Sequence, residues 1–240
     1  MCAIAGEVNI KDGVGFAPYH VDMIETMKQR GPDDDGMYCA NCAVLLHARL
    51  AVIDPQNGRQ PMSTATGDNY YTIVYNGELY NTAEIRTQLE SEGERFHTHS
   101  DTEVVLKAYA HYGQSCVELF NGIFAFAIWD EENKSLFIAR DRLGVKPFFY
   151  AERKNSFIFA SELKGLLAHP EIDAVIGQRG LSEILFVGPG RTPGCGVFED
   201  VCELRPGFCG YFTENGLRLQ QYWGYEDRPH TDSLQETISK

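Results

Sequence analysis

The segment GIFAFAIWD at residues 122–130 constrains the fold most, because it is apolar at almost every position. In a β-strand alternate side chains lie on opposite faces, so Phe124 and Phe126 would face one way and Ala125 and Trp129 the other. A strand that is apolar on both faces has to be covered on both faces. The segment therefore predicts a layered α+β fold, in which this sheet packs against a second sheet on one side and against helices on the other.

Short apolar segments bounded by turn residues predict further strands, and apolar residues at helical spacing predict helices. The expected strands lie at residues 2–10, in a hairpin over 37–53, at 70–75, in an antiparallel meander over 122–160 and within 197–223. The expected helices lie near 19–29, from Asn81, from Ser100, at 161–168 and at 180–186. Ser100 followed three residues later by Glu103 has the pattern of a capping box.

The composition excludes several classes of protein. Of 240 residues, 21 are Lys or Arg and 34 are Asp or Glu, which gives a net charge of −13. An extended basic surface for nucleic acid or anionic lipid is therefore not expected. No apolar stretch approaches the ~18 residues that span a bilayer, and the first residues do not resemble a signal peptide. We expect a cytoplasmic protein without nucleic-acid or membrane partners.

The seven cysteines form an odd set spread over a long chain, which predicts free thiols rather than a disulfide framework. Cys39 and Cys42 have the spacing of half a zinc site or of a redox pair, but the chain holds no second pair with this spacing. We interpret them as packed thiols and expect no metal site.

The character of the chain changes after Trp223. Residues 224–240 are polar, contain a proline and include Ser233 with Glu236 three residues on, a pattern typical of a helix start. We interpret residues 2–223 as one domain and residues 224–240 as a linker that leads into a further domain.

Cys2 is the most informative single residue. Removal of Met1 would leave a thiol and a free α-amino group on one residue. The reference pKa of an α-amino group, ~7.7–8.0, suits a base at neutral pH, and that of the thiol is ~8.5. Such a nucleophile carries its own base and needs no histidine. Taken alone, however, a free cysteine is more often a small buried apolar side chain.

Seven segments resemble, in order, those of the glutamine amidotransferase domain of the N-terminal-nucleophile hydrolases, the class II amidotransferases. They are MCAIAG at the N-terminus, RGPDDDG at 30–36, HARLAVID at 47–54, YNGELYN at 75–81, HSDTEV at 99–104, ARDRLGVKPFFY at 139–150 and SELKGL at 161–166. RTPGCGV at 191–197 and QQYW at 220–223 bring the resemblance closest to the glutaminase half of the glutamine-hydrolysing asparagine synthetases. The resemblance covers residues 2–223 and implies a four-layer αββα sandwich.

The resemblance also implies roles for individual residues. Cys2 would attack the side-chain amide of glutamine, and Asn76 and Gly77 would form the oxyanion hole. Arg49 would bind the α-carboxylate of the substrate through its planar guanidinium, and Asp101 would bind the α-ammonium. The remaining residues expected to line the substrate pocket are Leu50, Ala51, Val52, Ile53 and Glu78. The two charged contacts would select a free amino acid over a peptide amide.

Several of these residues also have a simpler interpretation. Asn76-Gly77 after the strand-like YYTIVY is a strong hairpin-turn signal, although Glu78 and the residues after it make a poor returning strand. Arg49 could be an exposed strand residue, as most arginines are exposed. Asp101 in the first turn of a helix stabilises the helix dipole whatever else it does.

The resemblance implies an enzyme of asparagine biosynthesis, the glutaminase half of a ligase, which hydrolyses L-glutamine to L-glutamate and ammonia. Two departures from the family pattern stand out: residue 3 is Ala where the family often has Gly, and the chain lacks the SGGxDS-type loop of the synthetase domain. Ammonia would therefore pass to a synthetase domain or subunit for ATP-dependent amidation of aspartate. No cofactor is expected for the glutaminase reaction, since ATP and Mg²⁺ act only in the synthetase domain, and a homodimer is the default expectation.

Two alternatives stay open. The ammonia acceptor could belong to amino sugar or purine synthesis, as in glucosamine-phosphate synthase or phosphoribosyl-pyrophosphate amidotransferase, although RTPGCGV and QQYW favour the asparagine synthetases. Alternatively, the domain could be a catalytically silent binding or dimerisation module. Retention of Met1 would favour the silent module, because a blocked α-amino group cannot act as a base.

Overall fold

The computed structural model describes residues 1–188, 190–227 and 229–239, and its strands form two antiparallel six-stranded sheets. Sheet A has the order β10-β8-β9-β1-β3-β2 and consists of β1 (Ala3–Asn9), β2 (Asp34–Cys39), β3 (Ala43–Arg49), β8 (Phe149–Arg153), β9 (Ser156–Ala160) and β10 (Val201–Glu203). Sheet B has the order β12-β11-β7-β6-β5-β4 and consists of β4 (Met62–Thr66), β5 (Asn69–Leu79), β6 (Gly122–Asp130), β7 (Ser135–Arg140), β11 (Phe208–Thr213) and β12 (Gly216–Gln221).

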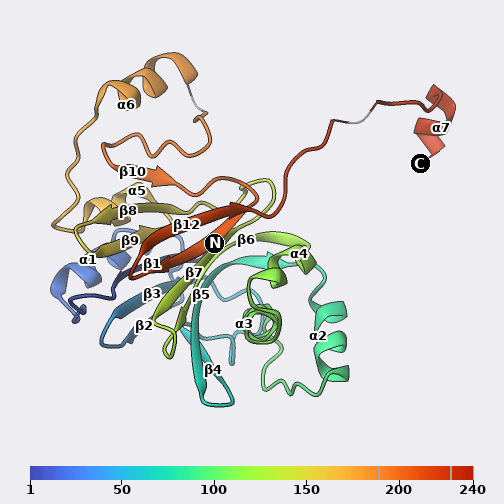
Figure 1. Cartoon of the computed structure of the whole chain (residues 1–240), viewed down its shortest axis with the longest axis horizontal. Helices are drawn as coiled ribbons and strands as arrows, with labels where there is room; N and C mark the ends of the chain where they lie inside the picture. Colours follow the sequence, from blue (N-terminus) through green and yellow to red (C-terminus); the bar gives the residue numbers. More distant parts are fainter. Residues whose placement is uncertain (189, 228, 240) are drawn as a thin grey trace.

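Helices lie on the outer sides of the two sheets (Figure 1). On the side of sheet A are α1 (Pro18–Glu25) and α5 (Leu163–Leu167). On the side of sheet B are α2 (Thr82–Ser91), α3 (Asp101–Tyr112), the 3-10 turn η1 (Gly113–Ser115) and α4 (Cys116–Leu119). The remaining helical elements are α6 (Gln178–Ser182), the π-helical turn η2 (Glu183–Val187) and α7 (Leu234–Ser239).

Three buried apolar clusters separate the layers. Met23 of α1 and Leu166 of α5 pack against sheet A. Trp129 of β6 belongs to the cluster between the two sheets. Phe126 of the same strand belongs to the cluster that joins sheet B to Val105 of α3. The two faces of β6 are thus buried against different layers, which confirms the predicted α+β sandwich with four layers in the order αββα.

The chain crosses between the sheets where a single meander was expected. β6 and β7 pair in sheet B, whereas β8 and β9 pair in sheet A, so the prediction of one meander over 122–160 is wrong. Residues 141–148 make the crossing. The expected helix near 19–29 is also shorter, because α1 ends at Glu25 and the chain continues in turns. The segment 70–75 is part of a longer strand, β5, which extends to Leu79.

Asn76 and Gly77 do not form a hairpin turn. β5 runs through both residues, and it pairs Asn76 with Ala125 and Gly77 with Phe124 of β6. The hairpin interpretation of this dipeptide is therefore wrong. The dipeptide instead lies in an interior strand of sheet B, where the backbone is held on a rigid element.

Ser100 is the N-cap of α3, as the sequence indicates, but the hydrogen bonds differ from those of the predicted capping box. Oγ of Ser100 accepts a hydrogen bond from the backbone N–H of Thr102 at 3.2 Å. The carboxylate of Glu103 instead accepts from the N–H groups of His97 at 2.9 Å and of Thr98 at 2.7 Å. Glu103 thus fixes the loop that precedes the helix rather than its first residue.

All seven cysteines are free, as predicted, but Cys39 is exposed and Cys42 only partly buried, so the prediction of packed thiols is wrong for Cys39. After Trp223 the chain leaves the sandwich and ends in α7 (Figure 1). The carboxylate of Glu236 accepts hydrogen bonds from the N–H and the hydroxyl of Ser233, as the helix-start pattern predicts. Residues 228 and 240 of this segment lie outside the described residues. Within the described ranges, no helix has the length and apolar character needed to cross a membrane.

Candidate active site

A cavity of about 80 Å³ lies where several strands and a helix end meet. The start of β1 brings Cys2 to it, the end of β3 brings Arg49, the interior of β5 brings Asn76, and the first turn of α3 brings Asp101. The predicted site residues that line the cavity are Cys2, Arg49, Leu50, Val52, Ile53, Asn76, Gly77, Glu78 and Asp101. Ala51 is absent from the lining, and its N–H donates to a carboxylate oxygen of Asp33 at 2.8 Å.

The thiol of Cys2 is partly buried against the end of β3. Sγ of Cys2 accepts a hydrogen bond from the N–H of Leu50 at 3.4 Å and lies 3.6 Å from the carbonyl oxygen of the same residue. Burial raises the pKa of the Cys2 thiol, while the Leu50 N–H and the nearby charges of Arg49 and Lys146 oppose the rise. A raised pKa leaves the thiol protonated at neutral pH, so a nucleophilic attack by Cys2 requires a base.

Met1 covers one side of this cavity. Its α-amino group donates to the carbonyl oxygen of Arg30 at 3.0 Å, and its Sδ accepts from Nζ of Lys146 at 3.2 Å. The Arg30 side chain in turn holds the backbone of Cys2, because its Nε donates to the Cys2 carbonyl at 3.1 Å. While Met1 is attached, the nitrogen of Cys2 is a peptide nitrogen and cannot act as a base.

Asn76 offers an unused hydrogen-bond donor to the cavity. The residue is 1% exposed, and in the part of the chain that the structure describes its Nδ2 has no hydrogen-bond partner. Buried donors without a partner are rare in folded proteins, because each one costs ~1–3 kcal/mol. The next residue, Gly77, is tightly confined: a Cβ there would lie 2.7 Å from the hydroxyl of Tyr75 and from the carbonyl of Ile123. The strand therefore places the amide donor of Asn76 next to a position, residue 77, that has room only for glycine.

Arg49 is buried rather than exposed, so the interpretation as a surface strand residue is wrong. Its Nη1 donates to the carbonyl of Pro55 at 2.8 Å, and its Nη2 donates to the carbonyls of Asp54 at 2.8 Å and of Ile53 at 3.4 Å. These bonds take three of the five N–H donors of the guanidinium. Gly58 permits this packing, because a Cβ there would lie 2.8 Å from Nη2. Arg49 thereby shapes the loop at 50–58 into one wall of the cavity.

Asp101 is buried where the first turn of α3 forms another wall of the cavity. Its Oδ2 accepts hydrogen bonds of 3.1 Å from the hydroxyl of Tyr75 and from the N–H of Leu79. Burial raises the pKa of Asp101, and both hydrogen bonds oppose the rise. Gln60 braces the same wall: its Oε1 accepts from the N–H of Tyr75 at 2.6 Å, and its Nε2 donates to Oγ1 of Thr102 at 3.2 Å.

Several residues of this cavity were not predicted from the sequence. Gln60, Tyr75 and Lys146 line it, and Arg30 holds the backbone of Cys2. Lys146 lies in the segment ARDRLGVKPFFY and Tyr75 in YNGELYN, so both were inside quoted motifs without an assigned role. Gln60 lies outside every motif, and no sequence pattern could have indicated it.

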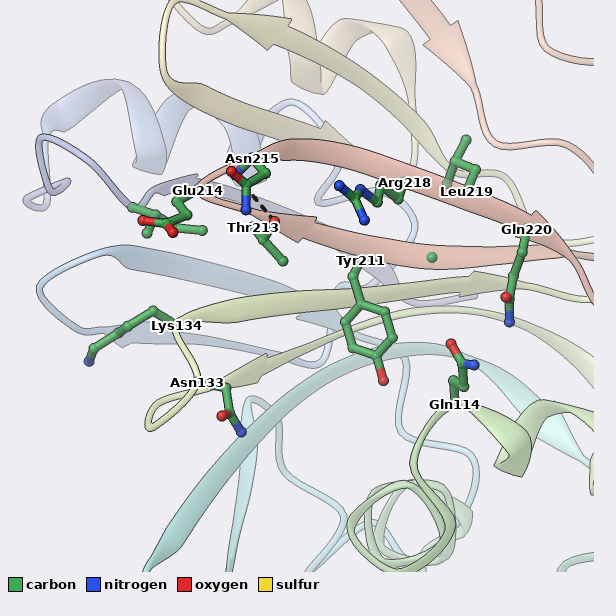
Figure 2. A pocket seen from close by; sticks show the side chains of 12 residues that line it. Gln114, Asn133, Lys134, Tyr211, Thr213, Glu214, Asn215, Arg218, Leu219 and Gln220 are labelled. Carbon is green, nitrogen blue, oxygen red and sulfur yellow. Dashed lines mark hydrogen bonds between the residues drawn. The ribbon is translucent and has the colours of Figure 1, made fainter.

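A larger hollow of about 790 Å³ lies elsewhere, beside β11 and β12. Figure 2 shows Tyr211 near its centre, with Asn133 and Lys134 toward one end and Gln114 and Gln220 toward the other. Its described lining residues include no cysteine and none of the predicted site residues. The small cavity at Cys2, and not this hollow, is therefore the candidate active site.

The sandwich and its cavity define a class of protein. A four-layer αββα domain whose first strand carries a cysteine from the N-terminus into a polar cavity has the architecture of the N-terminal-nucleophile amidotransferase domains. A family model described as "Glutamine amidotransferase domain" matches residues 1–223. The chain belongs to this glutamine amidotransferase domain family.

Relatives and solved structures agree with this assignment. Asparagine synthetase (glutamine-hydrolyzing) 3 of Bacillus subtilis (strain 168) is 47% identical over 240 residues, which are all of this chain and 39% of that protein. Asparagine synthetase (glutamine-hydrolyzing) 1 of the same organism is 39% identical over 77% of this chain and 29% of that protein. The structure of glutamine phosphoribosylpyrophosphate amidotransferase from B. subtilis with ADP and GMP matches 95% of this chain and 50% of that chain with a TM-score of 0.67. At 17% identity, that likeness shows the fold alone.

Proposed function

We propose that this domain hydrolyses L-glutamine to L-glutamate and ammonia through a γ-glutamyl thioester on Cys2. The observation that carries the proposal is the shared cavity, which brings together the thiol of Cys2, the unused amide donor of Asn76, the guanidinium of Arg49 and the carboxylate of Asp101. Glutamine has a complementary group for each of them: a carboxamide, its carbonyl oxygen, an α-carboxylate and an α-ammonium. Family membership supports the same substrate.

Acylation begins once Met1 is removed and Cys2 carries a free α-amino group. That amine takes the thiol proton, directly or through a water, as the sulfur attacks the carboxamide carbon of glutamine. Nδ2 of Asn76 and the N–H of Gly77 stabilise the oxyanion that forms. The Cys2 ammonium then returns its proton to the amide nitrogen, the C–N bond breaks, and ammonia leaves behind a thioester.

Deacylation uses the same base. The neutral amine of Cys2 accepts a proton from a water molecule as its oxygen attacks the thioester carbonyl. The C–S bond breaks, the proton passes to the thiolate, and L-glutamate leaves. In this scheme no metal or organic cofactor takes part in either half of the reaction.

Substrate selection rests on two opposed charges. The positive charge of Arg49 and its remaining N–H donors would bind the α-carboxylate. Asp101 would bind the α-ammonium, which its ionised form attracts. The segment at residues 50–53 and Glu78 would complete the pocket through their backbone groups.

We assign the ammonia to an ATP-dependent synthetase domain or subunit that amidates aspartate, because two relatives are named asparagine synthetases. ATP and Mg²⁺ would be needed there and not for the glutaminase reaction. In this proposal residues 2–223 form the glutaminase domain, and residues 224–240 connect it to the acceptor. We also propose a cytoplasmic location, and the net charge of −13 argues against nucleic-acid and anionic membrane partners.

The test is the release of glutamate from L-glutamine, with L-asparagine as the control substrate. We expect the wild-type protein to release glutamate from glutamine, and the Cys2→Ala variant to release none while it keeps its fold. Cys39→Ala is the matched control, because it removes an exposed thiol from β2 and should leave the rate unchanged. Substantial turnover by Cys2→Ala would refute the proposal.

One observation favours a second candidate, a catalytically silent binding or dimerisation module. The α-amino group of Met1 has a hydrogen-bond partner, the Arg30 carbonyl at 3.0 Å, so a retained Met1 fits the cavity. The intact mass of the purified protein separates the two. Loss of Met1 together with glutamate release supports the enzyme, and retention of Met1 without glutamate release supports the silent module.

A further inference from the structure

Lys146 is a buried lysine at the candidate active-site cavity, and none of the described carboxylates forms an ion pair with it. The residue is 4% exposed and lines the cavity with Cys2. Among the residues with described positions, no Asp or Glu oxygen lies within 4.0 Å of its Nζ, and its hydrogen bond goes to the weak acceptor Sδ of Met1 at 3.2 Å. Because burying an ammonium without a counter-ion is costly, unpaired lysines of this kind point to a functional role.

The loop that carries Lys146 is held without the help of its side chain. The carboxylate of Asp141 accepts hydrogen bonds of 2.9 Å from the N–H groups of Val145 and Lys146. The guanidinium of Arg140 donates to the carbonyls of Lys146 at 2.6 Å and of Gly144 at 2.7 Å. The backbone is thus fixed by its neighbours, and the lysine side chain is free to serve the cavity.

Several charges act on this ammonium from the surrounding elements. They are Glu78 on β5, Arg30 after α1, Asp141 at the start of the crossing loop, and the thiol of Cys2 before β1. Burial lowers the pKa of Lys146, and Arg30 lowers it further, while the carboxylates and the thiol oppose this. Removal of Met1, which the proposed function requires, would take away the sulfur acceptor and create an amino group on Cys2, which lines the same cavity as Lys146.

We propose that Lys146 is a positioning residue whose ammonium keeps the α-amino group of Cys2 neutral and able to accept a proton. A neighbouring positive charge disfavours a second one, so it opposes protonation of the amine. The same charge favours the thiolate of Cys2. This inference rests on the proposed function, in which the neutral amine is the base for both acylation and deacylation.

The experiment compares Lys146→Met and Lys146→Gln, which remove the charge, with Lys146→Arg, which keeps it. Lys11→Gln is the matched control, because Lys11 is exposed beyond the far end of β1, more than about 20 Å from Cys2 along a strand that rises ~3.3 Å per residue. All proteins are freed of Met1, with methionine aminopeptidase where needed. Circular dichroism verifies that each variant is folded.

The first readout is the pKa of the Cys2 amino group itself, measured by competitive labelling with an amine-reactive reagent over a pH series and mass spectrometry of the N-terminal peptide. We expect that pKa to rise by about one unit in Lys146→Met and Lys146→Gln and to stay near the wild-type value in Lys146→Arg and Lys11→Gln. The second readout is the acid limb of kcat/KM for glutamine, which should move to higher pH by the same amount, while KM at the optimum changes less than about twofold.

An unchanged amino-group pKa in the two neutral variants would overturn the inference, whatever their activity. If the wild-type protein without Met1 releases no glutamate, the proposed function fails instead, and the labelling result still decides whether Lys146 acts on the amine. If only one of Lys146→Met and Lys146→Gln folds, the pKa of the Cys2 amino group in that variant decides.

Discussion

The hydroxyl of Tyr75 donates a 3.1 Å hydrogen bond to the carboxylate of Asp101. Tyr75 directly precedes Asn76 on β5, so the strand that carries the unused amide donor also fixes the carboxylate at the start of α3. The amide of Asn76 and the carboxylate of Asp101, which are 25 positions apart in the sequence, are therefore both held by β5. Small displacements of β5 would disturb both groups together, and in the proposed function these groups bind the two ends of glutamine.

Replacement of Tyr75 by Phe should change the pH dependence of substrate binding. The Tyr75 hydroxyl lowers the pKa of Asp101 against the effect of burial, so its loss should raise that pKa further. Only the ionised carboxylate binds an ammonium. KM for glutamine should therefore begin to increase at a higher pH in Tyr75→Phe than in the wild type as the solution is acidified, and the two should agree at alkaline pH. KM profiles that coincide over the whole range would contradict the pairing of Asp101 with the substrate ammonium.

Replacement of Asn76 by Ala should lower kcat by ~10²–10³, which is typical for the loss of one oxyanion-hole donor. The melting temperature should change little, because Nδ2 of Asn76 has no partner among the described residues and its removal leaves no bond broken. Asn215→Ala, in the exposed turn between β11 and β12, is the control for a general effect of the substitution. A large loss of stability with normal kcat would assign Asn76 a structural role instead.

Replacement of Arg49 by Lys should raise KM for glutamine by about tenfold or more, because an ammonium cannot hold the carbonyls of Asp54 and Pro55 and also bind a carboxylate. Amide hydrogen exchange in residues 50–58 should become faster, since the loop loses its anchor. Arg59→Lys, whose side chain is 78% exposed, should alter neither quantity. Unchanged KM in Arg49→Lys would argue against carboxylate binding at this residue.

Stability below neutral pH should depend on Glu7, which is buried on β1 with hydrogen bonds to Tyr19, His20, His169 and Ser156. Burial favours a higher pKa for Glu7, but these bonds outweigh it and hold the pKa well below 4.5. A carboxyl with a lowered folded-state pKa stabilises the protein above its unfolded pKa and loses this effect as the pH falls.

Glu7→Gln should therefore reduce the free energy of unfolding at pH 7 by about 3 kcal/mol, the upper end of what a hydrogen bond to a charged group contributes. The difference from the wild type should shrink as the pH falls below about 4.5, as urea denaturation at several pH values can show. A difference that is constant from pH 7 to pH 3 would contradict the role of the Glu7 charge.

Much of the fold could be predicted from the sequence, because a strand that is buried on both faces is apolar at almost every position. The pattern around Trp129 predicted the layers correctly. The crossing between sheets after Arg140 could not be predicted, since strands in either sheet have the same apolar pattern and only the pairing partners differ. At Asn76-Gly77 the local turn propensity indicated a hairpin, but the poor returning strand after Gly77 argued against it, and the dipeptide lies on β5, which pairs with β6.

The site residues that lie in a family motif could be predicted from the sequence. Those that reach the cavity only through tertiary contacts could not. Cys2, Arg49 and Asp101 lay in segments shared with a known family, and the structure places them on one cavity. Gln60 reaches the same cavity because its side chain bridges β5 and α3, which is a property of the tertiary fold. Lys146 lay inside a motif, but its burial without a counter-ion became visible only once its surroundings were known.

The most direct test of the whole account is the chemical identity of the acylated residue. Mature protein is mixed with L-glutamine, quenched in acid within the first turnovers and digested, and the peptide that begins at Cys2 is analysed by mass spectrometry. The account predicts one γ-glutamyl group bonded through the sulfur of Cys2, which forms and decays at the rate of glutamate release. Glutamate release with an unmodified Cys2 peptide throughout, or a γ-glutamyl group on another residue such as Cys39, would contradict it.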